Sequence, residues 1–167
     1  MKIGLLSDTH SFLDEKVFLH FKDCDEIWHG GDIGSSDVVD RLEAFKPLRA
    51  VFGNIDDAPM RQRYPEDLWF TCEGIQVWIT HIGGVPPNYN PRVKAILKNK
   101  IPDLFICGHS HILKIARDQK LNNMLYINPG AAGKHGFHHI KTLVRFDISD
   151  QKISNVEVIE IGKRAAL

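Results

Sequence analysis

One stretch near the N-terminus, IGLLSDTH at residues 3–10, decides the fold. It is a short, continuously apolar run that ends in polar residues, a pattern typical of a buried β-strand, here over residues 2–7. Asp8 and His10, two metal-ligand residue types, follow directly. In α/β proteins, binding sites form outside the carboxyl ends of the strands. The stretch therefore predicts both a sheet and the edge at which a site would form.

The same arrangement recurs four more times along the chain. Each time an apolar run of strand length stops, and a metal-ligand residue type stands at or just beyond the break. These residues are Asp32 after 26–28, Asn54 after 48–52, His81 after 75–80, and His109 and His111 after 103–107. Strand ends that meet at one edge would bring all seven side chains into a common space. The sequence thus predicts a metal site.

Glycine immediately precedes three of these residues, at Gly31, Gly53 and Gly108. Glycine lets a strand turn sharply and lets a metal or a phosphate approach the backbone closely. Each motif alone is weak evidence, since aspartates commonly cap helices and histidines often lie in cores. The prediction depends on all five breaks occurring in one chain.

The predicted donor set favours two divalent cations. Asp8 and Asp32 supply two negative charges, and Asn54 and the four neutral histidines supply none. Two divalent ions would leave a positive surplus that holds a hydroxide and an anionic phosphate. A bound metal brings the pKa of water from 15.7 to about 7, and a second ion ~3.5–4 Å away lets one oxyanion span both. Nitrogen and oxygen donors suit Mn, Fe, Co, Ni or Zn better than Ca or Mg, and the sequence leaves the choice open.

Composition predicts one domain over residues 1–167, with 43% hydrophobic and 25% charged residues. The 21 basic residues balance the 21 acidic ones, which disfavours long nucleic acid and acidic membranes as partners. No apolar run has the length of a membrane span or of a signal-peptide core, so we expect a cytoplasmic protein. Three cysteines outside CxxC pairs predict reduced, buried thiols; a ligand role for Cys107 is a weaker alternative.

The first third of the chain has a β-α-β-α-β rhythm, which predicts parallel strands with right-handed crossovers. The expected strands are 2–7, 25–29 and 48–52, and the expected helices are 13–23 and one from Ser35 or Ser36 to Phe45. A loop with at most a short helical turn should follow over 54–66, then a hairpin around Glu73-Gly74. A rigid loop at 83–87, a helix from Pro91 and strands near 103–107, 112–117, 124–127, 142–148 and 153–161 complete the chain. We predict an α/β fold of the α+β sandwich type, with two packed mixed β-sheets flanked by helices.

The order DxH…GD…GN…H…GHxH resembles that of the calcineurin-like metallophosphoesterase superfamily, over residues 1 to about 148. The small size and the segment 53–56 are similar to its compact YfcE-like phosphodiesterase branch. The resemblance implies an αββα fold and hydrolysis of phosphodiesters or phosphomonoesters, often with manganese. It implies a first metal on Asp8, His10, Asp32 and His111, and a second on Asp32, Asn54, His81 and His109.

Two departures from the superfamily pattern matter. Many members carry a histidine after the asparagine, thought to stabilise the transition state or protonate the leaving oxygen, where this chain has Ile55. Without that acid, leaving groups of low pKa should be favoured. After His81, many relatives carry a glycine and a histidine where this chain has Ile82-Gly83, which removes one substrate contact.

The resemblance points to Asp32, Asn54 and His109 for catalysis. Further candidates for substrate contact, or for support of the ligands, are His29, Asp56, Arg92 and His135. His29 either donates to a ligand carboxylate or is a plain buried strand residue, and the sequence does not decide between them. The turn at 128–130 is either near the site or an ordinary turn.

We expect a metal-dependent phosphoesterase, foremost a phosphodiesterase, in which a hydroxide bridging two metal ions attacks a small phosphate ester. Manganese is the first choice of metal. The alternative is a catalytically weak or inactive protein-binding scaffold of the same fold, as in the retromer subunit. The natural substrate, the general acid and the oligomeric state, including a homo-oligomer, stay open.

Overall fold

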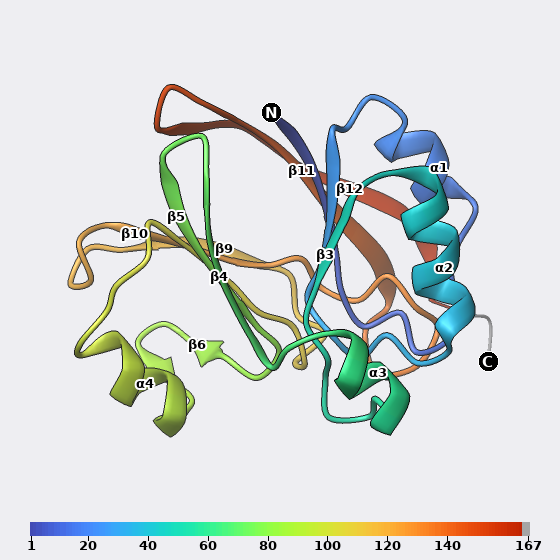
Figure 1. Cartoon of the computed structure of the whole chain (residues 1–167), viewed down its shortest axis with the longest axis horizontal. Coiled ribbons are helices and arrows are strands. Elements are labelled where there is room, and N and C mark those ends of the chain that lie inside the picture. The colour runs from blue at the N-terminus through green and yellow to red at the C-terminus, as the bar shows by residue number, and fades with distance from the viewer. Residues whose placement is uncertain (165–167) are drawn as a thin grey trace.

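A computed structural model describes residues 1–164 and shows two five-stranded mixed β-sheets packed between helices (Figure 1). The first sheet has the order β12-β11-β1-β2-β3. Its strands are β1 (Lys2–Leu6), β2 (Glu26–His29), β3 (Leu48–Ala50), β11 (Ile140–Ser149) and β12 (Lys152–Lys163). β1, β2 and β3 are parallel, β11 pairs antiparallel with β1, and β12 pairs antiparallel with β11. The carboxyl ends of β1, β2 and β3 therefore lie at one edge.

The second sheet has the order β4-β5-β8-β10-β9. Its strands are β4 (Asp67–Cys72), β5 (Ile75–Thr80), β8 (Leu104–Ile106), β9 (Lys114–Asp118) and β10 (Met124–Asn128). β5, β8 and β10 are parallel, so a second set of carboxyl ends lies at one edge. A two-stranded ribbon of β6 (Gly84–Val85) and β7 (Asn88–Tyr89) lies beyond β5.

The helices lie on the outer sides of the two sheets (Figure 1). α1 (Lys16–Phe21), α2 (Ser36–Phe45) and α3 (Ala58–Arg63) lie on the side of the first sheet, and α4 (Pro91–Leu97) packs on the second. Within residues 1–164, none of the helices is long and apolar enough to cross a membrane.

Strand β1 shows why the opening stretch is continuously apolar. Successive side chains of a strand point to opposite faces. Leu5 packs in the core between the sheets, whereas Leu6 packs against the helices. Both are fully buried. Because both faces of the strand are covered, polar residues at alternate positions would be buried and would cost stability. The predicted fold class, two packed mixed β-sheets flanked by helices, is confirmed.

Three local predictions need correction. The helix expected over 13–23 is limited to Lys16–Phe21. The segment 54–66 holds the six-residue α3, whose N-cap Asp57 accepts a hydrogen bond from the Met60 amide at 3.1 Å. The rigid loop at 83–87 contributes to the β6–β7 ribbon. The Asp57 cap accounts for α3 and the strand pairing for the ribbon, whereas α1 has no side-chain capping hydrogen bond that would extend it.

Candidate metal centre

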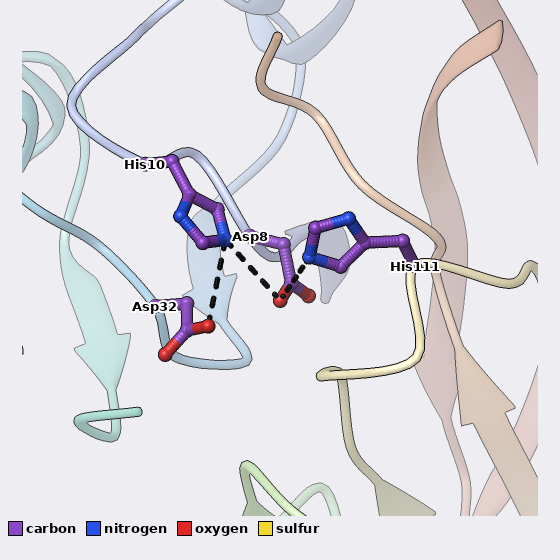
Figure 2. Close-up of side chains that lie close together, drawn as sticks. All are labelled: Asp8, His10, Asp32 and His111. Atoms are coloured by element: carbon purple, nitrogen blue, oxygen red, sulfur yellow. Dashed lines mark ion pairs between the residues drawn. The ribbon is translucent and has the colours of Figure 1, made fainter. Parts of the chain in front are cut away.

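Four predicted ligands meet where β1, β2 and β8 end (Figure 2). Asp8, His10, Asp32 and His111 each offer one ligand atom, and these atoms lie within 4.8 Å of one another. His111 Nε2 lies 3.1 Å from Asp8 Oδ1. His10 Nε2 lies 3.4 Å from Asp32 Oδ2 and 4.0 Å from Asp8 Oδ1. We call these four residues the first group.

A second group forms on the other side of Asp32. Ligand atoms of Asp32, His81 and His109 also lie within 4.8 Å of one another. Asn54 joins them, because its Oδ1 atom lies 3.1 Å from His81 Nε2 and 2.9 Å from His109 Nδ1. Asp32 belongs to both groups: Oδ2 faces His10, while Oδ1 lies 3.2 Å from His81 Nε2. All seven predicted side chains are thus brought together.

Backbone contacts hold several of these side chains in place. His81 Nδ1 lies 2.8 Å from the Gly30 carbonyl oxygen and donates a hydrogen bond to it. The proton of the neutral ring is then on Nδ1, so the lone pair of Nε2 is available to a metal. The His109 amide donates to Asp8 Oδ2 at 3.2 Å, and the Ile55 amide donates to Asp32 Oδ1 at 3.1 Å. The loops therefore orient the donors before any ion binds.

Unsatisfied buried atoms test whether these residues fit a cation. Within residues 1–164, three buried side-chain nitrogen or oxygen atoms have no hydrogen-bond partner, and two of them, Asp8 Oδ1 and His10 Nε2, belong to the first group. Buried polar atoms are nearly always paired, and an unpaired buried charge is costly. A divalent cation among the first group would satisfy both atoms, so the residues present fit a metal.

The backbone of the ligand loops is unusual as well. Five of the seven side chains belong to residues with positive φ, at Asp8 (55°), His10 (46°), Asp32 (53°), His109 (68°) and His111 (60°). Non-glycine residues rarely adopt this left-handed conformation, and such strain gathers at functional sites. The surrounding structure therefore imposes the conformation that turns these side chains toward one another.

Opposing effects set the pKa values in the centre. Burial alone would lower the pKa of His81, but its contact with Asp32 and the charges of Asp8 and Asp32 outweigh burial and raise it. For Asp32, burial acts in the opposite direction and raises the pKa. The contact with His81 has the larger effect when combined with the Ile55 amide and the nearby histidines, so the net shift of the Asp32 pKa is downward. His10 is different, since burial lowers its pKa despite the nearby carboxylates. The negative charges of Asp8 and Asp32 therefore favour a positive charge, such as a cation, between the ligands.

Comparisons with known proteins agree with this geometry. Residues 1–151 match the family described as "Calcineurin-like phosphoesterase superfamily domain". The chain belongs to this family. A probable metallophosphoesterase from Methanothermobacter thermautotrophicus is 31% identical over 140 residues, covering 78% of this chain and 77% of that protein. Another probable metallophosphoesterase, from Methanocaldococcus jannaschii, is 28% identical over 137 residues, covering 78% of this chain and 68% of that protein.

Solved structures support the fold. An archaeal phosphodiesterase superposes with a TM-score of 0.74 at 23% identity, covering 95% of this chain and all of that one. Wild-type Vps29 from Entamoeba histolytica, complexed with zinc, superposes with a TM-score of 0.73 at 18% identity, covering 99% and 100%. The resemblance to the calcineurin-like phosphoesterases read from the sequence is confirmed, as is the fold that it implied.

His29 does not contact a ligand carboxylate. Its Nδ1 accepts a hydrogen bond from the Gly31 amide at 3.1 Å, so Nε2 carries the proton and donates to Thr9 Oγ1 at 3.0 Å. Burial lowers the pKa of His29 to about 4, so the ring is neutral near pH 7. Thr9 in turn donates to the Ile33 carbonyl oxygen at 2.9 Å. Of the two readings of His29, the structure supports the buried strand residue, here one that ties β2 to the first ligand loop.

Asp56 is buried and binds three backbone amides. It accepts hydrogen bonds from Gly53 at 2.7 Å, Gly34 at 2.8 Å and Ile33 at 3.1 Å. These bonds join the loop that carries Asn54 to the loop that carries Asp32. The structure therefore places Asp56 behind the ligands and facing the loops.

Arg92 and His135 lie at opposite sides of the centre. Arg92 donates to Asp67 at 2.7 Å and to Thr80 Oγ1 at 2.7 Å, and it lines a cavity of about 330 Å³ with Asn54 and His81. The His135 ring lies 4.9 Å from the His10 ring, centroid to centroid. Arg92 is thus held by its own partners beside the second group, and His135 covers the first.

Thr9 was not predicted as a functional residue, whereas His138 belongs to the glycine-rich segment 131–139, for which a phosphate contact was a weaker expectation than a surface loop. Thr9 is fully buried between two ligands and bonds His29, and its position inside DTH was the only available signal. The His138 ring packs 5.2 Å from that of His111, and its Nδ1 is the third unpaired buried atom. Cys107 contacts the Tyr126 hydroxyl at 3.1 Å and belongs to neither group, as expected for a buried strand thiol. Asn128 donates to the Gly108 carbonyl oxygen at 2.8 Å, so the turn at 128–130 does support the site.

Proposed function

We propose that this chain is a phosphodiesterase that uses two divalent transition-metal ions, with manganese as the first candidate and Zn, Fe, Co or Ni as alternatives. One observation carries the proposal: two groups of donors share Asp32, and two buried atoms of the first group have no hydrogen-bond partner among residues 1–164. Asp8, His10 and His111 would hold one ion with Asp32. Asn54, His81 and His109 would hold the other. Such ions, when bound, supply a water of lowered pKa and neutralise charge on a phosphoryl group.

The ligand types set the charge available to a substrate. Only Asp8 and Asp32 are anionic, so the donors do not cancel the charge of two divalent ions. The Asp32 contact to both groups and the Asn54 amide between two histidines would keep the donors fixed while the substrate binds. Fixed donors stabilise developing charge without reorganising during the reaction.

The residue after Asn54 restricts the substrate. The Ile55 side chain is 44% exposed and has no proton to donate. Esters whose leaving groups have a low pKa, such as aryl phosphates, should therefore react faster than alkyl phosphates. A diester also suits the surroundings of the centre, because separate cavities adjoin Asn54 and His109. Each of the two ester substituents would then have its own space.

Asp32→Asn tests the proposal with almost no change in side-chain size. With manganese and bis(4-nitrophenyl) phosphate, we expect the wild-type chain to hydrolyse the diester and the variant to lose at least ~1,000-fold in kcat, since one side chain serves both ions. Titration calorimetry should show two bound ions in the wild type and weakened binding at both sites in the variant. His20→Ala, at a half-buried position of helix α1 that belongs to neither group, should change neither quantity.

The protein-binding scaffold remains the alternative function and makes a different prediction. A scaffold would bind two ions yet hydrolyse neither the diester nor 4-nitrophenyl phosphate. Turnover that follows metal occupancy contradicts the scaffold, and full occupancy without turnover contradicts the phosphodiesterase.

A further inference from the structure

A cavity of about 600 Å³ lies beside the second group, between the β6–β7 ribbon and the segment 108–114. Gly108 and the proposed ligand His109 form part of its lining. A group bound in this cavity therefore lies next to the point where a phosphate would bind. The volume of the cavity is within the range of about 300–1,000 Å³ that is usual for small-molecule sites.

The cavity is lined mainly by apolar and aromatic side chains: Ile82, Val85, Tyr89, Pro91, Ile112 and Tyr126. The two phenol groups are already paired. Tyr126 donates to the Gly84 carbonyl oxygen at 2.6 Å, and Tyr89 donates to Asp118 at 2.7 Å. The partly exposed ring of Tyr89 thus offers apolar surface to the cavity, and the buried Tyr126 forms part of its floor. Among the described residues that line it, none is Asp or Glu.

Exposure and charge indicate what the cavity would accept. Ile112 is 67% exposed and Val85 is 42% exposed, so apolar surface is left in water at its mouth. An apolar ligand that covers them would gain free energy from burial. Lys114 also lines the cavity and forms no ion pair within the described part of the chain. A ring with a hydrogen-bond acceptor at its edge would match this combination.

The neighbouring cavity has more charged residues in its lining. It adjoins Asn54 and His81, is also lined by Arg61, Glu66 and Arg92, and measures about 330 Å³. Ile82 and Asn90 line both cavities, so the two meet at a shared wall. The second group therefore adjoins a smaller cavity with several charged residues and a larger, more apolar one.

We propose that the larger cavity binds an aromatic or apolar substituent of the phosphate ester, and that it determines which phosphodiesters the chain selects. The inference rests on the proposed phosphodiesterase function and adds a substrate class to it: diesters with one aromatic or apolar substituent and one smaller, polar substituent. The ring would lie between Val85 and Ile112, against Tyr89, with the phosphate at the second group.

Binding of two phosphonates, which are not hydrolysed, tests this proposal without relying on turnover. Zinc-loaded protein is titrated with phenylphosphonate and with methylphosphonate, and binding is followed through the methyl resonances of Val85 and Ile112. We expect phenylphosphonate to bind about tenfold more tightly, from the added apolar burial, and to shift both residues. Methylphosphonate should bind without shifting them.

Variants separate the cavity from the metal centre. Val85→Ser with Ile112→Ser should reduce the tenfold preference to about twofold or less and leave methylphosphonate binding unchanged. Leu19→Ser is the matched control, an equally exposed apolar residue on α1 (62%), and should keep the preference.

The other outcomes contradict the cavity proposal alone or the cavity and phosphodiesterase proposals together. Equal binding of the two phosphonates, or a preference that survives the double variant, overturns the cavity proposal and leaves the phosphodiesterase proposal standing. Failure of both phosphonates to bind zinc-loaded protein overturns both proposals. Shifts of Val85 and Ile112 that depend on protein concentration alone would assign the cavity to a second copy of the chain and overturn the ligand proposal.

Discussion

At the scale of single residues, the site depends on positions where no side chain fits. A Cβ atom at Gly53 would lie 2.1 Å from Asp32 Oδ1 and 2.2 Å from the Asp32 backbone nitrogen. Both distances are far below van der Waals contact, and one of the atoms is backbone. The glycine before Asn54 is therefore needed for Asp32 to reach both groups.

Gly53→Ala should displace Asp32 and so weaken both metal sites. We expect at least a tenfold loss of metal affinity and a decrease of ~1–3 kcal/mol in the free energy of unfolding. Calorimetry and urea denaturation measure the two effects. Gly74→Ala is the control: its φ of 81° strains an alanine by ~1 kcal/mol, but it lies in the β4–β5 turn and should leave metal affinity intact. Unchanged metal binding in Gly53→Ala would contradict the assigned role.

Residue types at strand ends predicted which side chains meet, but the sequence could not predict how they are oriented. The backbone at Asp8, Asp32 and His111 is left-handed; Asp and His adopt this conformation more often than most non-glycine residues, but still in a small minority of cases, so their identity alone does not predict it. His29 shows the same limit. Its neutral state follows from complete burial and from the Gly31 amide, and both are tertiary facts.

At the scale of elements, the buried strands were predictable and the helix ends were not. The apolar runs of β1 and β8 are buried on both faces, and such continuous runs are a clear signal in a sequence. The predicted first helix extended to residues 13–23, whereas α1 spans only Lys16–Phe21. Glu15, at the N-cap of α1, makes no side-chain capping hydrogen bond. The position of the helix depends instead on its packing against β1.

That packing rests on Gly4 in β1. A Cβ atom at Gly4 would lie 2.6 Å from Cγ of Phe21, a fully buried ring at the end of α1. Gly4→Ala should therefore push α1 outward and destabilise the fold by ~1–3 kcal/mol in urea unfolding. Adding Phe21→Leu to Gly4→Ala should cost less than the sum of the single changes, because the smaller side chain makes room. Additive losses in this double-mutant cycle would show that the two elements do not meet as described.

At the scale of the whole molecule, the centre joins the two sheets. Asp8, His10, Asp32 and Asn54 follow strands β1 to β3 of the first sheet, and His81, His109 and His111 follow β5 and β8 of the second. An ion bound by ligands from both sheets would connect the sheets at the edge opposite the β4–β5 turn. These ligands come together only in the folded chain. Ligands that bind only the folded state stabilise it by mass action.

Metal should therefore raise the unfolding temperature, and the rise should depend on pH. An ion at 100 times its Kd adds about 2.7 kcal/mol per site. His81 must lose its proton to bind an ion, and because its pKa is raised above 6.5, protons begin to compete before the pH falls to that value. Thermal unfolding with and without manganese should show a large shift at pH 8 and a much smaller one at pH 6. Asp32→Asn should show little shift at either pH; a wild-type shift that is the same at both would mean that the histidines of the second sheet do not bind the ion.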